Sequence, residues 1–492
     1  MLHLTKLTDQ LTSIYKVINS NFLISGISCD SREIRKGMIF AAVNGTKRKG
    51  INFLNQALKQ GASAVLCDKK DAKKIKEKKI NILVSDNIRL AISNIANKFY
   101  PLQPSVIVGV TGTNGKTTIV NFLRNIWINN NFNGASIGTL GIQYNRYNKQ
   151  TKLTTLDPIN LHKEITKLKK KKIDFLALEA SSHALDQHRL DNLRIKYAVF
   201  TNLSRDHLDY HKSMEKYFLS KFRLFKFILN KKGLALINTD NIYGKKLKNL
   251  CLDNNIKNIS YGKDKENDWQ ILSAKKLKNS TKVKFRKEKK IYEFECLLFA
   301  DFEIENLFCS MILANITGIS LVNILKGIKK IKRPQGRLNK VKVLKSDINV
   351  FIDYAHTPEA LKSCLISLKK ELKKQGKLIL LFGCGGNRDT GKRKLMGKIA
   401  EKYADEVFIT DDNPRYESAK NIRSEISKYC KKSIDIANRK KAIKKAINVM
   451  KEEDILLIAG KGHEKNQIIK GKYYPFDDEI IARNAILKRD LL

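Results

Sequence analysis

Residues 105–118, SVIVGVTGTNGKTT, have the types and spacing of a phosphate-binding loop. The apolar run from Val106 to Val110 predicts a buried strand, and the apolar residues that follow the loop recur at helical spacing. The first amides of a helix are unpaired, and glycines let the backbone approach phosphate oxygens. Lys116 can supply a point charge to the β- and γ-phosphates, and the Thr117 hydroxyl can ligate Mg²⁺. We therefore predict a nucleotide site here.

Polar side chains end the apolar runs in the central part of the chain. Glu179 ends the run IDFLALE, and the next run, YAVFTN, continues into LSRDHLDYH. Ligands of a mostly parallel doubly wound sheet gather at the carboxyl ends of its strands. We therefore predict Thr117, Glu179 and His207 as magnesium ligands, with a structural role as the alternative for His207. Asp206 and Asp209 are interpreted as turn and cap residues.

The C-terminal part of the chain repeats this arrangement. Four strand-like runs, which begin at Ile348, Leu378, Glu406 and Ile455, are each followed by a polar motif. These motifs are DYAHTP, GCGGNRD, DNPR and GKGHE. The alternation of strands and helices predicts a second parallel α/β sheet. Two α/β domains are therefore expected to face a shared cleft.

The elements that must position these residues fall into three predicted domains. A chain of 492 residues is too long for one hydrophobic core. Pro101 in YPLQPS and Pro334 in KRPQGRLN mark seams, which divide the chain into residues 1–100, 101–335 and 336–492. We expect a small N-terminal α/β domain, a central P-loop ATP-binding parallel-sheet domain and a C-terminal Rossmann-like α/β domain.

The strong positive charge raises nucleic acid as a partner. Lysine and arginine outnumber the acidic residues by 95 to 48, which gives a net charge of +47. The lysines are spread over the whole length, in runs such as residues 73–79 and 167–172, instead of forming one footprint. We interpret this distribution as a general compositional bias with solvated lysine faces.

Cysteine spacing and hydropathy favour a cytoplasmic protein. The eight cysteines form no C-x-x-C pair and no cluster with zinc spacing, which is typical of reduced thiols. No apolar run approaches the roughly 18 residues of a membrane span, and the first residues lack an apolar secretory core. We expect no membrane insertion.

Seven motifs in this order resemble those of the Mur ligases, which build the peptidoglycan precursor: TGTNGKTT, EASSHALDQHR, TNLSRDHLDYH, DYAHTPEAL, FGCGGNRDTGKR, DNPR and GKGHE. The resemblance runs from Ser31 to Glu464. It is closest to the members that add meso-2,6-diaminopimelate to UDP-N-acetylmuramoyl-L-alanyl-D-glutamate. It implies that ATP activates a carboxylate as an acyl phosphate, from which an amine displaces phosphate to form the amide.

The resemblance also implies the catalytic residues and the cofactors. Lys116, His207 and Lys221 would be catalytic, and Lys221 would carry a carbamate derived from CO₂ that helps hold a second Mg²⁺. The metal ligands would then be Thr117, Glu179, His207 and Lys221. No covalent protein nucleophile is needed, so catalysis would depend on positioning two substrates and screening their charge.

Three sets of binding residues follow from the resemblance. The ATP set is Gly112, Thr113, Asn114, Gly115, Lys116, Thr117, Thr118, Asn306 and His356. The UDP-sugar set is Ser31, Thr46, Lys47, Arg48, Thr154, Thr155, Ser181, Gln187 and Arg189. The diaminopimelate set is Arg388, Asp412, Asn413, Pro414, Arg415, Gly460 and Glu464.

Arg415 is the residue expected to select the incoming amine. A guanidinium can grip the distal carboxylate of diaminopimelate in a two-point fork, which lysine as a substrate would not offer. The turn at Asn413 and Pro414 would aim this side chain. The expected partners are therefore three small molecules, ATP, the UDP-sugar dipeptide and diaminopimelate, bound by a monomer.

Three alternatives stay open at this point. The first is the same fold with another amine, L-lysine, or with folylpolyglutamate chemistry; Arg415 and the pair Thr154 and Thr155 argue against it. The second is a basic nucleic-acid-binding P-loop ATPase, which would need basic residues and aromatics clustered along one groove. The third is a homologue that has lost activity, against which the intact Lys116 and Glu179 argue.

Overall fold

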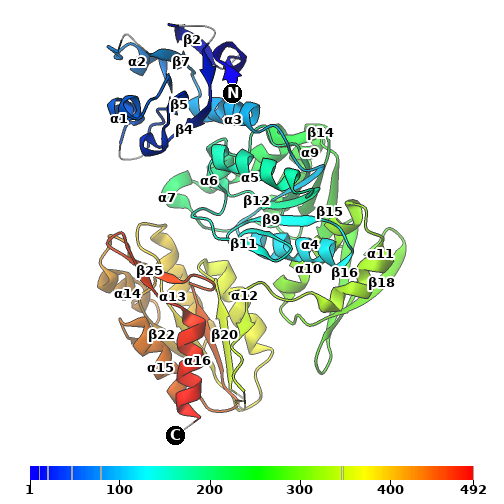
Figure 1. Cartoon of the computed structure of the whole chain (residues 1–492). Coiled ribbons are helices and arrows are strands. Elements are labelled where there is room, and N and C mark those ends of the chain that lie inside the picture. Colours follow the sequence, from blue (N-terminus) through cyan, green and yellow to red (C-terminus); the bar gives the residue numbers. More distant parts are fainter. Residues whose placement is uncertain are drawn as a thin grey trace.

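The computed structural model describes residues 1–9, 12–18, 22–45, 48–77, 80–344, 346 and 348–490. The predicted substrate residues Thr46 and Lys47 lie outside the described residues. The chain folds into three successive α/β parts, each built on its own sheet (Figure 1). The strands of these sheets lie on either side of residues 100 and 335, and we propose domain boundaries near those positions.

The N-terminal sheet has the strand order β2-β7-β6-β5-β4, parallel except for the pair β2 and β7. Its strands are β2 (Ser13–Lys16), β4 (Gly26–Ser28), β5 (Met38–Ala41), β6 (Ala64–Cys67) and β7 (Asn81–Val84). Its helices are α1 (Leu54–Lys59), α2 (Lys69–Ala72) and α3 (Ile88–Phe99), and a small pair joins β1 (Leu2–His3) to β3 (Leu23–Ile24).

The central sheet has eleven strands in the order β11-β10-β9-β12-β8-β13-β14-β15-β16-β17-β18. These are β8 (Val106–Thr111), β9 (Gly134–Gly138), β10 (Gly141–Tyr144), β11 (Tyr147–Lys149), β12 (Phe175–Glu179), β13 (Ile195–Phe200), β14 (Leu229–Asn238), β15 (Asn258–Gly262), β16 (Trp269–Lys276), β17 (Thr281–Lys287) and β18 (Lys290–Cys296). The helices are α4 (Lys116–Asn129), α5 (Pro158–Lys170), α6 (Ser182–Asp186), α7 (Leu208–His211), α8 (Met214–Arg223), α9 (Ile242–Asp253), α10 (Asp301–Ile316) and α11 (Leu321–Gly327).

The middle of this sheet is parallel and both of its ends are antiparallel. Strands β9 to β16 pair in parallel through β12, β8, β13, β14 and β15, whereas β9-β10-β11 and β16-β17-β18 are meanders. The sequence predicted the parallel strands β12, β13 and β14 to within a few residues. It did not predict the second meander, because lysines on its exposed faces interrupt the apolar pattern.

The C-terminal sheet has the order β19-β20-β24-β21-β22-β23 and is parallel except at β19. Its strands are β19 (Asn339–Lys340), β20 (Asn349–Asp353), β21 (Leu378–Phe382), β22 (Glu406–Ile409), β23 (Ser433–Asp435) and β24 (Ile455–Ala459), followed by the hairpin β25 (Asn466–Ile469) and β26 (Lys472–Pro475). Its helices are α12 (Pro358–Lys369), α13 (Gly391–Tyr403), α14 (Ala419–Ser427), α15 (Arg439–Val449) and α16 (Asp478–Arg489).

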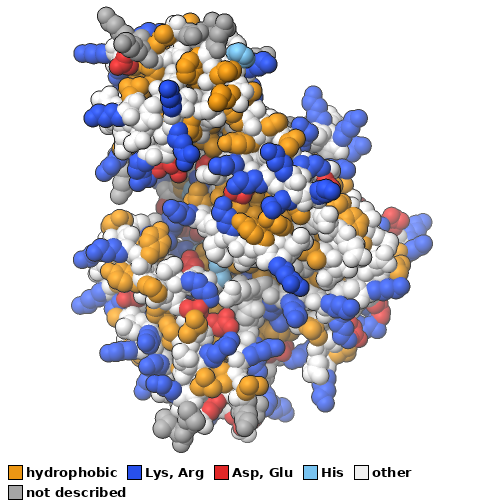
Figure 2. All heavy atoms as spheres, viewed as in Figure 1, with side chains coloured by type: hydrophobic (Ala, Val, Ile, Leu, Met, Phe, Trp, Pro, Cys, Tyr) orange, Lys and Arg blue, Asp and Glu red, His pale blue; other side chains and the backbone are white. Residues whose placement is uncertain are grey.

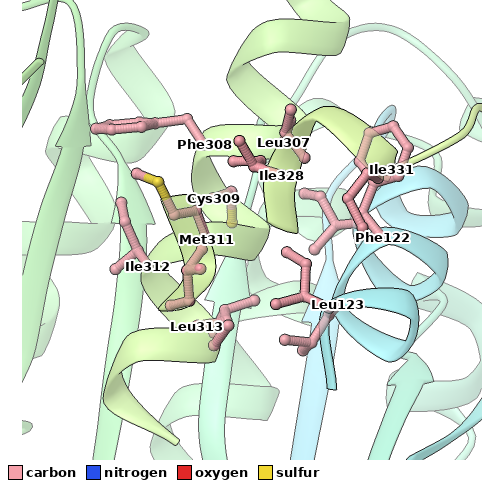
Figure 3. Close-up of a cluster of buried hydrophobic side chains, with 14 of the residues drawn as sticks. Phe122, Leu123, Leu307, Phe308, Cys309, Met311, Ile312, Leu313, Ile328 and Ile331 are labelled. Carbon is pink, nitrogen blue, oxygen red and sulfur yellow. The ribbon is translucent and has the colours of Figure 1, made fainter. Parts of the chain in front are cut away.

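The helix that leaves the phosphate loop is anchored by a hydrophobic core. Phe122 and Leu123 of α4 belong to the same buried cluster as Leu307 and Met311 of α10 (Figure 3). Burial of each such side chain contributes about 1.5–3 kcal/mol. The loop at the N-terminus of α4 therefore stands on a firmly packed helix.

Two further predictions concern the surface. None of the helices within the described ranges is long and apolar enough to cross a membrane. Lysine and arginine side chains are scattered over all three parts on the face that Figure 2 shows. This distribution agrees with the interpretation of solvated lysine faces.

Candidate functional site

A cavity of about 620 Å³ lies between the central and C-terminal sheets. Both sheets contribute residues that follow the carboxyl ends of their strands, such as Asn202 after β13 and Gly460 after β24. The neighbouring strands β12, β8 and β13 are parallel, so their polar ends meet at one edge. The same holds for β20, β24 and β21. The shared cleft expected from the sequence is therefore present.

Two glycines of the phosphate loop, Gly112 and Gly115, pack closely against neighbouring residues. Gly112 has φ 147°, and a Cβ built on it would lie 1.9 Å from the Thr201 hydroxyl. Gly115 has φ 90°, and a Cβ there would lie 2.5 Å from Asn306 Oδ1. A side chain at either position would clash with a neighbour of the loop and would strain the backbone. Asn306, predicted as an ATP contact, therefore lies against the loop.

Two lysines donate to the same carbonyl of the loop. Lys116 Nζ and Lys221 Nζ each lie 2.8 Å from the Gly112 carbonyl oxygen, and Lys116 also donates to Thr113 at 2.7 Å. Lys221 is 1% exposed. Burial, reinforced by the charge of Lys116, holds the pKa of Lys221 well below its usual range, and burial also lowers the pKa of Lys116. The two amines therefore share one buried acceptor.

Thr117 and Glu179 form the oxygen-rich side of the cavity. Thr117 Oγ1 donates to Glu179 Oε2 at 3.0 Å, and Arg337 Nη2 donates to Thr117 Oγ1 at 3.0 Å. Glu179 is 2% exposed and also accepts from the Thr139 amide at 2.7 Å. Hydroxyl and carboxylate oxygens are ligands that Mg²⁺ prefers, usually together with substrate phosphates. Thr117 and Glu179 therefore fit a magnesium ion.

The other two predicted metal ligands make contacts with other groups. His207 contacts Asp206, with 3.4 Å between Nε2 and Oδ2, and Lys221 is engaged with the loop. Among the residues that the structure describes, no three His, Cys, Asp or Glu side chains gather closely enough to hold a metal alone.

Asp206 is contacted by two histidines and a lysine from two parts of the chain. His207 lies beside it, and His356 and Lys392 reach it from the C-terminal part at 3.6 and 3.8 Å. Burial alone would raise the pKa of Asp206, but the hydrogen bond of His356 and the charge of Lys392 hold it well below its ordinary value. Burial lowers the pKa of His207 to about 3. Asp206, interpreted from sequence as a turn residue, thus belongs to the cavity.

The predicted amine-binding residues form a hydrogen-bonded group. Arg415, with φ 53°, donates through Nη1 to the Gly386 carbonyl at 2.9 Å. Asn413 Nδ2 donates to Glu464 Oε2 at 2.8 Å. Lys461, completely buried, donates to Asn413 Oδ1 at 3.2 Å and to Glu464 Oε2 at 3.1 Å. Lys461 therefore holds the side chains of Asn413 and Glu464, which both line the cavity.

Four of the predicted UDP-sugar residues form a second group. Thr155 Oγ1 donates to Ser181 Oγ at 3.1 Å, and Arg189 Nη1 donates to the Thr155 carbonyl at 2.9 Å. Arg189 Nη2 also donates to Gln187 Oε1 at 2.6 Å. Ser31 is separate, since its hydroxyl donates to Gln56 within the N-terminal part.

The cavity brings together most of the predicted site residues: Thr113, Asn114, Gly115, Lys116, Thr117, Thr118, Thr154, Glu179, Ser181, His207, Lys221, Asn306, His356, Arg388, Asp412, Asn413, Arg415, Gly460 and Glu464. Of the predicted residues within the described part of the chain, seven do not line it: Ser31, Arg48, Gly112, Thr155, Gln187, Arg189 and Pro414.

Sequence reasoning missed several residues that line the cavity or support it. Arg337 contacts Thr117 and stacks on Tyr354, with 4.7 Å between its guanidinium carbon and the ring centre. It lies in KRPQGRLN, which the sequence indicated only as a seam. Lys392 and Lys461 were hidden among many lysines. For Arg337, its place next to the seam at Pro334 was a usable sequence signal.

Comparison with known proteins places the chain in a family. The Mur ligase family catalytic domain matches residues 23–100, the Mur ligase middle domain residues 110–314, and the Mur ligase glutamate ligase domain residues 336–462. The UDP-N-acetylmuramoyl-L-alanyl-D-glutamate--2,6-diaminopimelate ligase of Rickettsia typhi is 38% identical over 472 residues, which cover 95% of this chain and 94% of that protein. This chain therefore belongs to the Mur ligase family.

Solved structures share the fold. A structure of a ligase with that same name has a TM-score of 0.69 and 31% identity, and the match covers 99% of both chains. The MurF ligase of Thermotoga maritima in complex with ADP has a TM-score of 0.61 and 18% identity, covering 96% of this chain and 98% of that one. The three-domain α/β fold expected from the sequence is confirmed.

Proposed function

We propose that this chain is an ATP-dependent ligase that adds meso-2,6-diaminopimelate to UDP-N-acetylmuramoyl-L-alanyl-D-glutamate in peptidoglycan precursor synthesis. One observation carries the proposal: a single cavity holds the phosphate loop on one side and the group around Arg415 on the other. A phosphorylated carboxylate formed at the first side would face an amine held at the second. The relatives at 38% identity carry the name of this activity.

The central part would bind ATP and activate the carboxylate. Lys116 would exchange its bonds to the Gly112 and Thr113 carbonyls for the incoming phosphates, because a polyphosphate is the stronger acceptor. The D-glutamate carboxylate would attack the γ-phosphorus of ATP, which would form the acyl phosphate and release ADP. Asn306 and His356, which line the same cavity, would contact the nucleotide.

We propose two cofactors at this edge. Thr117 and Glu179 would hold Mg²⁺, which screens the phosphate charge when bound. Lys221 would carry a carbamate, since burial and the charge of Lys116 lower the pKa of its amine and only the neutral form of an amine attacks CO₂. The carbamate would convert a cation into an anion near His207.

The C-terminal part would select the amine. Arg388 and Arg415 would bind the distal carboxylate, and Asp412 and Glu464 would bind the ammonium group beside it. The reacting amine would attack the acyl carbon, and inorganic phosphate would leave. Glu464 is held in place by Lys461, so little ordering would accompany binding.

The UDP-sugar would bridge the N-terminal and central parts. Ser31 and Arg48 would contact it from the first part, and Gln187 and Arg189 from the second. A guanidinium such as Arg189 suits a diphosphate. We further propose that the enzyme acts in the cytoplasm as a monomer.

The test is phosphate release with ATP, Mg²⁺ and UDP-MurNAc-L-Ala-D-Glu, with either meso-diaminopimelate or L-lysine as the amine. We expect turnover only with diaminopimelate, and its loss in Arg415→Ala. Arg483→Ala, which removes a half-exposed arginine on α16, is the matched control. Equal turnover with L-lysine, or turnover without any amine, would contradict the proposal.

A further inference from the structure

Two loops at the rim of the cavity are joined by a bidentate ion pair. Arg205, which follows β13, donates through Nε to Asp389 Oδ2 and through Nη2 to Asp389 Oδ1, both at 3.0 Å. Asp389 precedes α13 in the C-terminal part. Two parallel N–H···O bonds to one carboxylate are the most directional form of such a pair. The contact therefore fixes both distance and orientation between the two parts.

The C-terminal side is shaped around the guanidinium. Asp389 is 4% exposed in its side chain and also accepts from the Gly391 amide at 3.0 Å, which holds the carboxylate in place. A Cβ built on Gly391 would lie 2.2 Å from Arg205 Nη2. Gly391 does not need a positive φ, so glycine at this position leaves room for Arg205.

A second charge pair crosses the gap beside the first. Asp206 of the central loop lies 3.8 Å from Lys392 of α13, and both side chains are buried. On the central loop the cation Arg205 precedes the anion Asp206, whereas on the C-terminal side the anion Asp389 precedes the cation Lys392. The two loops are therefore complementary in charge. Arg388, the neighbour of Asp389, lines the cavity between them.

We propose that Arg205 and Asp389 are positioning residues, whose ion pair holds the amine-binding residues of the C-terminal part against the phosphate loop. This inference rests on the proposed function. Neither residue lines the cavity. Their effect would pass through Arg388, the chain neighbour of Asp389, and through Lys392, which contacts Asp206 beside Arg205. Without the pair, the amine site and the acyl phosphate would not stay aligned.

Two other ion pairs between the same parts provide a matched control. Lys370 contacts Asp301 at 3.0 Å and Lys276 contacts Glu371 at 2.8 Å. Asp301 begins α10 two residues before Glu303, which pairs with Arg333 in the connecting segment. The side chains of Lys370 and Asp301 are both at least half exposed, so their removal is expected to change little.

The experiment is steady-state kinetics of the full chain, with each substrate varied in turn. In Arg205→Ala we expect kcat/KM for diaminopimelate to fall about 10- to 100-fold, with a raised KM for the amine and an unchanged KM for the UDP-sugar. Loss of folded protein would instead lower the apparent kcat and leave every KM unchanged. Lys370→Ala should stay within about twofold of the parent.

Two further variants test the pair itself. Asp389→Asn removes the charge but keeps an acceptor for the Gly391 amide, so combining it with Arg205→Ala should add no further loss. Gly391→Ala adds one methyl group that displaces Arg205, and its KM for the amine should rise in the same direction. Arg205→Lys should recover only part of the loss, because lysine cannot form the fork.

Additive losses in the double variant, or an unchanged amine KM in Arg205→Ala and Gly391→Ala, would overturn the inference. Failure of the proposed function looks different, since the parent protein would then show no diaminopimelate-dependent turnover. If the parent is active with diaminopimelate and the variants have the same kcat and KM values as the parent, only the positioning role would be rejected.

Discussion

The two edges that face the cavity hold their cations in different ways. At the central edge, Lys116 and Lys221 are bonded to the carbonyl of their own loop at Gly112. At the C-terminal edge, Lys461 is bonded to the side chains of Asn413 and Glu464. We therefore expect Lys116 to change partners when a polyphosphate binds, and Lys461 to keep its partners when the amine binds. The central edge is therefore suited to phosphoryl transfer, and the C-terminal edge to selection of the incoming amine.

The largest effect is expected from removing a cation at the central edge. Lys116→Met should lower ATP-dependent phosphate release by about 10²–10³-fold, because the developing charge on the phosphates would lose a direct donor. Binding of the UDP-sugar, measured by calorimetry, should stay unchanged. Lys245→Met, at an exposed position, is the control. A loss of less than about tenfold would mean that Lys116 keeps its loop bonds during the reaction.

A smaller effect is expected from replacing the fork at the C-terminal edge. Arg415→Lys keeps the charge but not the two-point geometry, so kcat/KM for diaminopimelate should fall about 10- to 100-fold. The KM for ATP should not move. Activity equal to the parent would show that charge alone, and not planar recognition, selects the amine.

Loss of the buried lysine at the C-terminal edge should cost still less. Lys461→Met keeps the length of the side chain but releases Asn413 and Glu464, so the KM for diaminopimelate should rise about tenfold with little change in kcat. Circular dichroism would check that the sheet is intact. If kcat fell and the KM stayed the same, the edge would not be a preorganised binding group.

The smallest effect on activity is expected away from both edges. Burial lowers the pKa of His162 on α5 to about 4, and its Nε2 lies 3.3 Å from the Asp191 carbonyl. Between pH 6.5 and 4 the unfolded chain binds this proton and the folded chain does not, so stability falls as the pH falls through that window. Removing this one titration should flatten the slope by at most about 1.4 kcal/mol per pH unit.

His162→Gln should therefore show a shallower decrease of Tm between pH 6.5 and 4, measured by thermal unfolding. Its phosphate release near neutral pH should stay within about twofold of the parent, since His162 does not line the cavity. An identical Tm profile in both proteins would mean that other histidines carry the whole pH dependence.

Local patterns predicted much of the fold and of the site. Strands β21 and β24 begin and end where the apolar runs do, because a buried parallel strand is apolar throughout. The phosphate loop was evident because glycines, a lysine and hydroxyl residues stand between a strand and a helix. The meander β16-β18 was missed, since residues such as Lys284 face solvent beside a buried Phe285. Strands with lysines at alternate positions resemble loops in a lysine-rich chain.

Single lysines could not be told apart by their sequence neighbours. Lys221 came from the family resemblance alone, and Lys392 and Lys461 were not predicted at all. Burial is what distinguishes them from solvated lysines, and burial depends on how α8, α13 and the segment after β24 pack. The buried lysines have specific partners: Lys221 bonds to the Gly112 carbonyl, Lys392 lies beside Asp206, and Lys461 bonds to Asn413 and Glu464.

The sequence by itself determined which residues stand at the carboxyl ends of strands, because strand and helix periods and glycine turns are local properties. The tertiary structure decided which of those ends meet. Arg337 reaches Thr117, and Arg205 reaches Asp389, across 220 and 184 positions of the chain. Such contacts depend on the order of the strands and on the packing of one domain against another, which no local pattern contains.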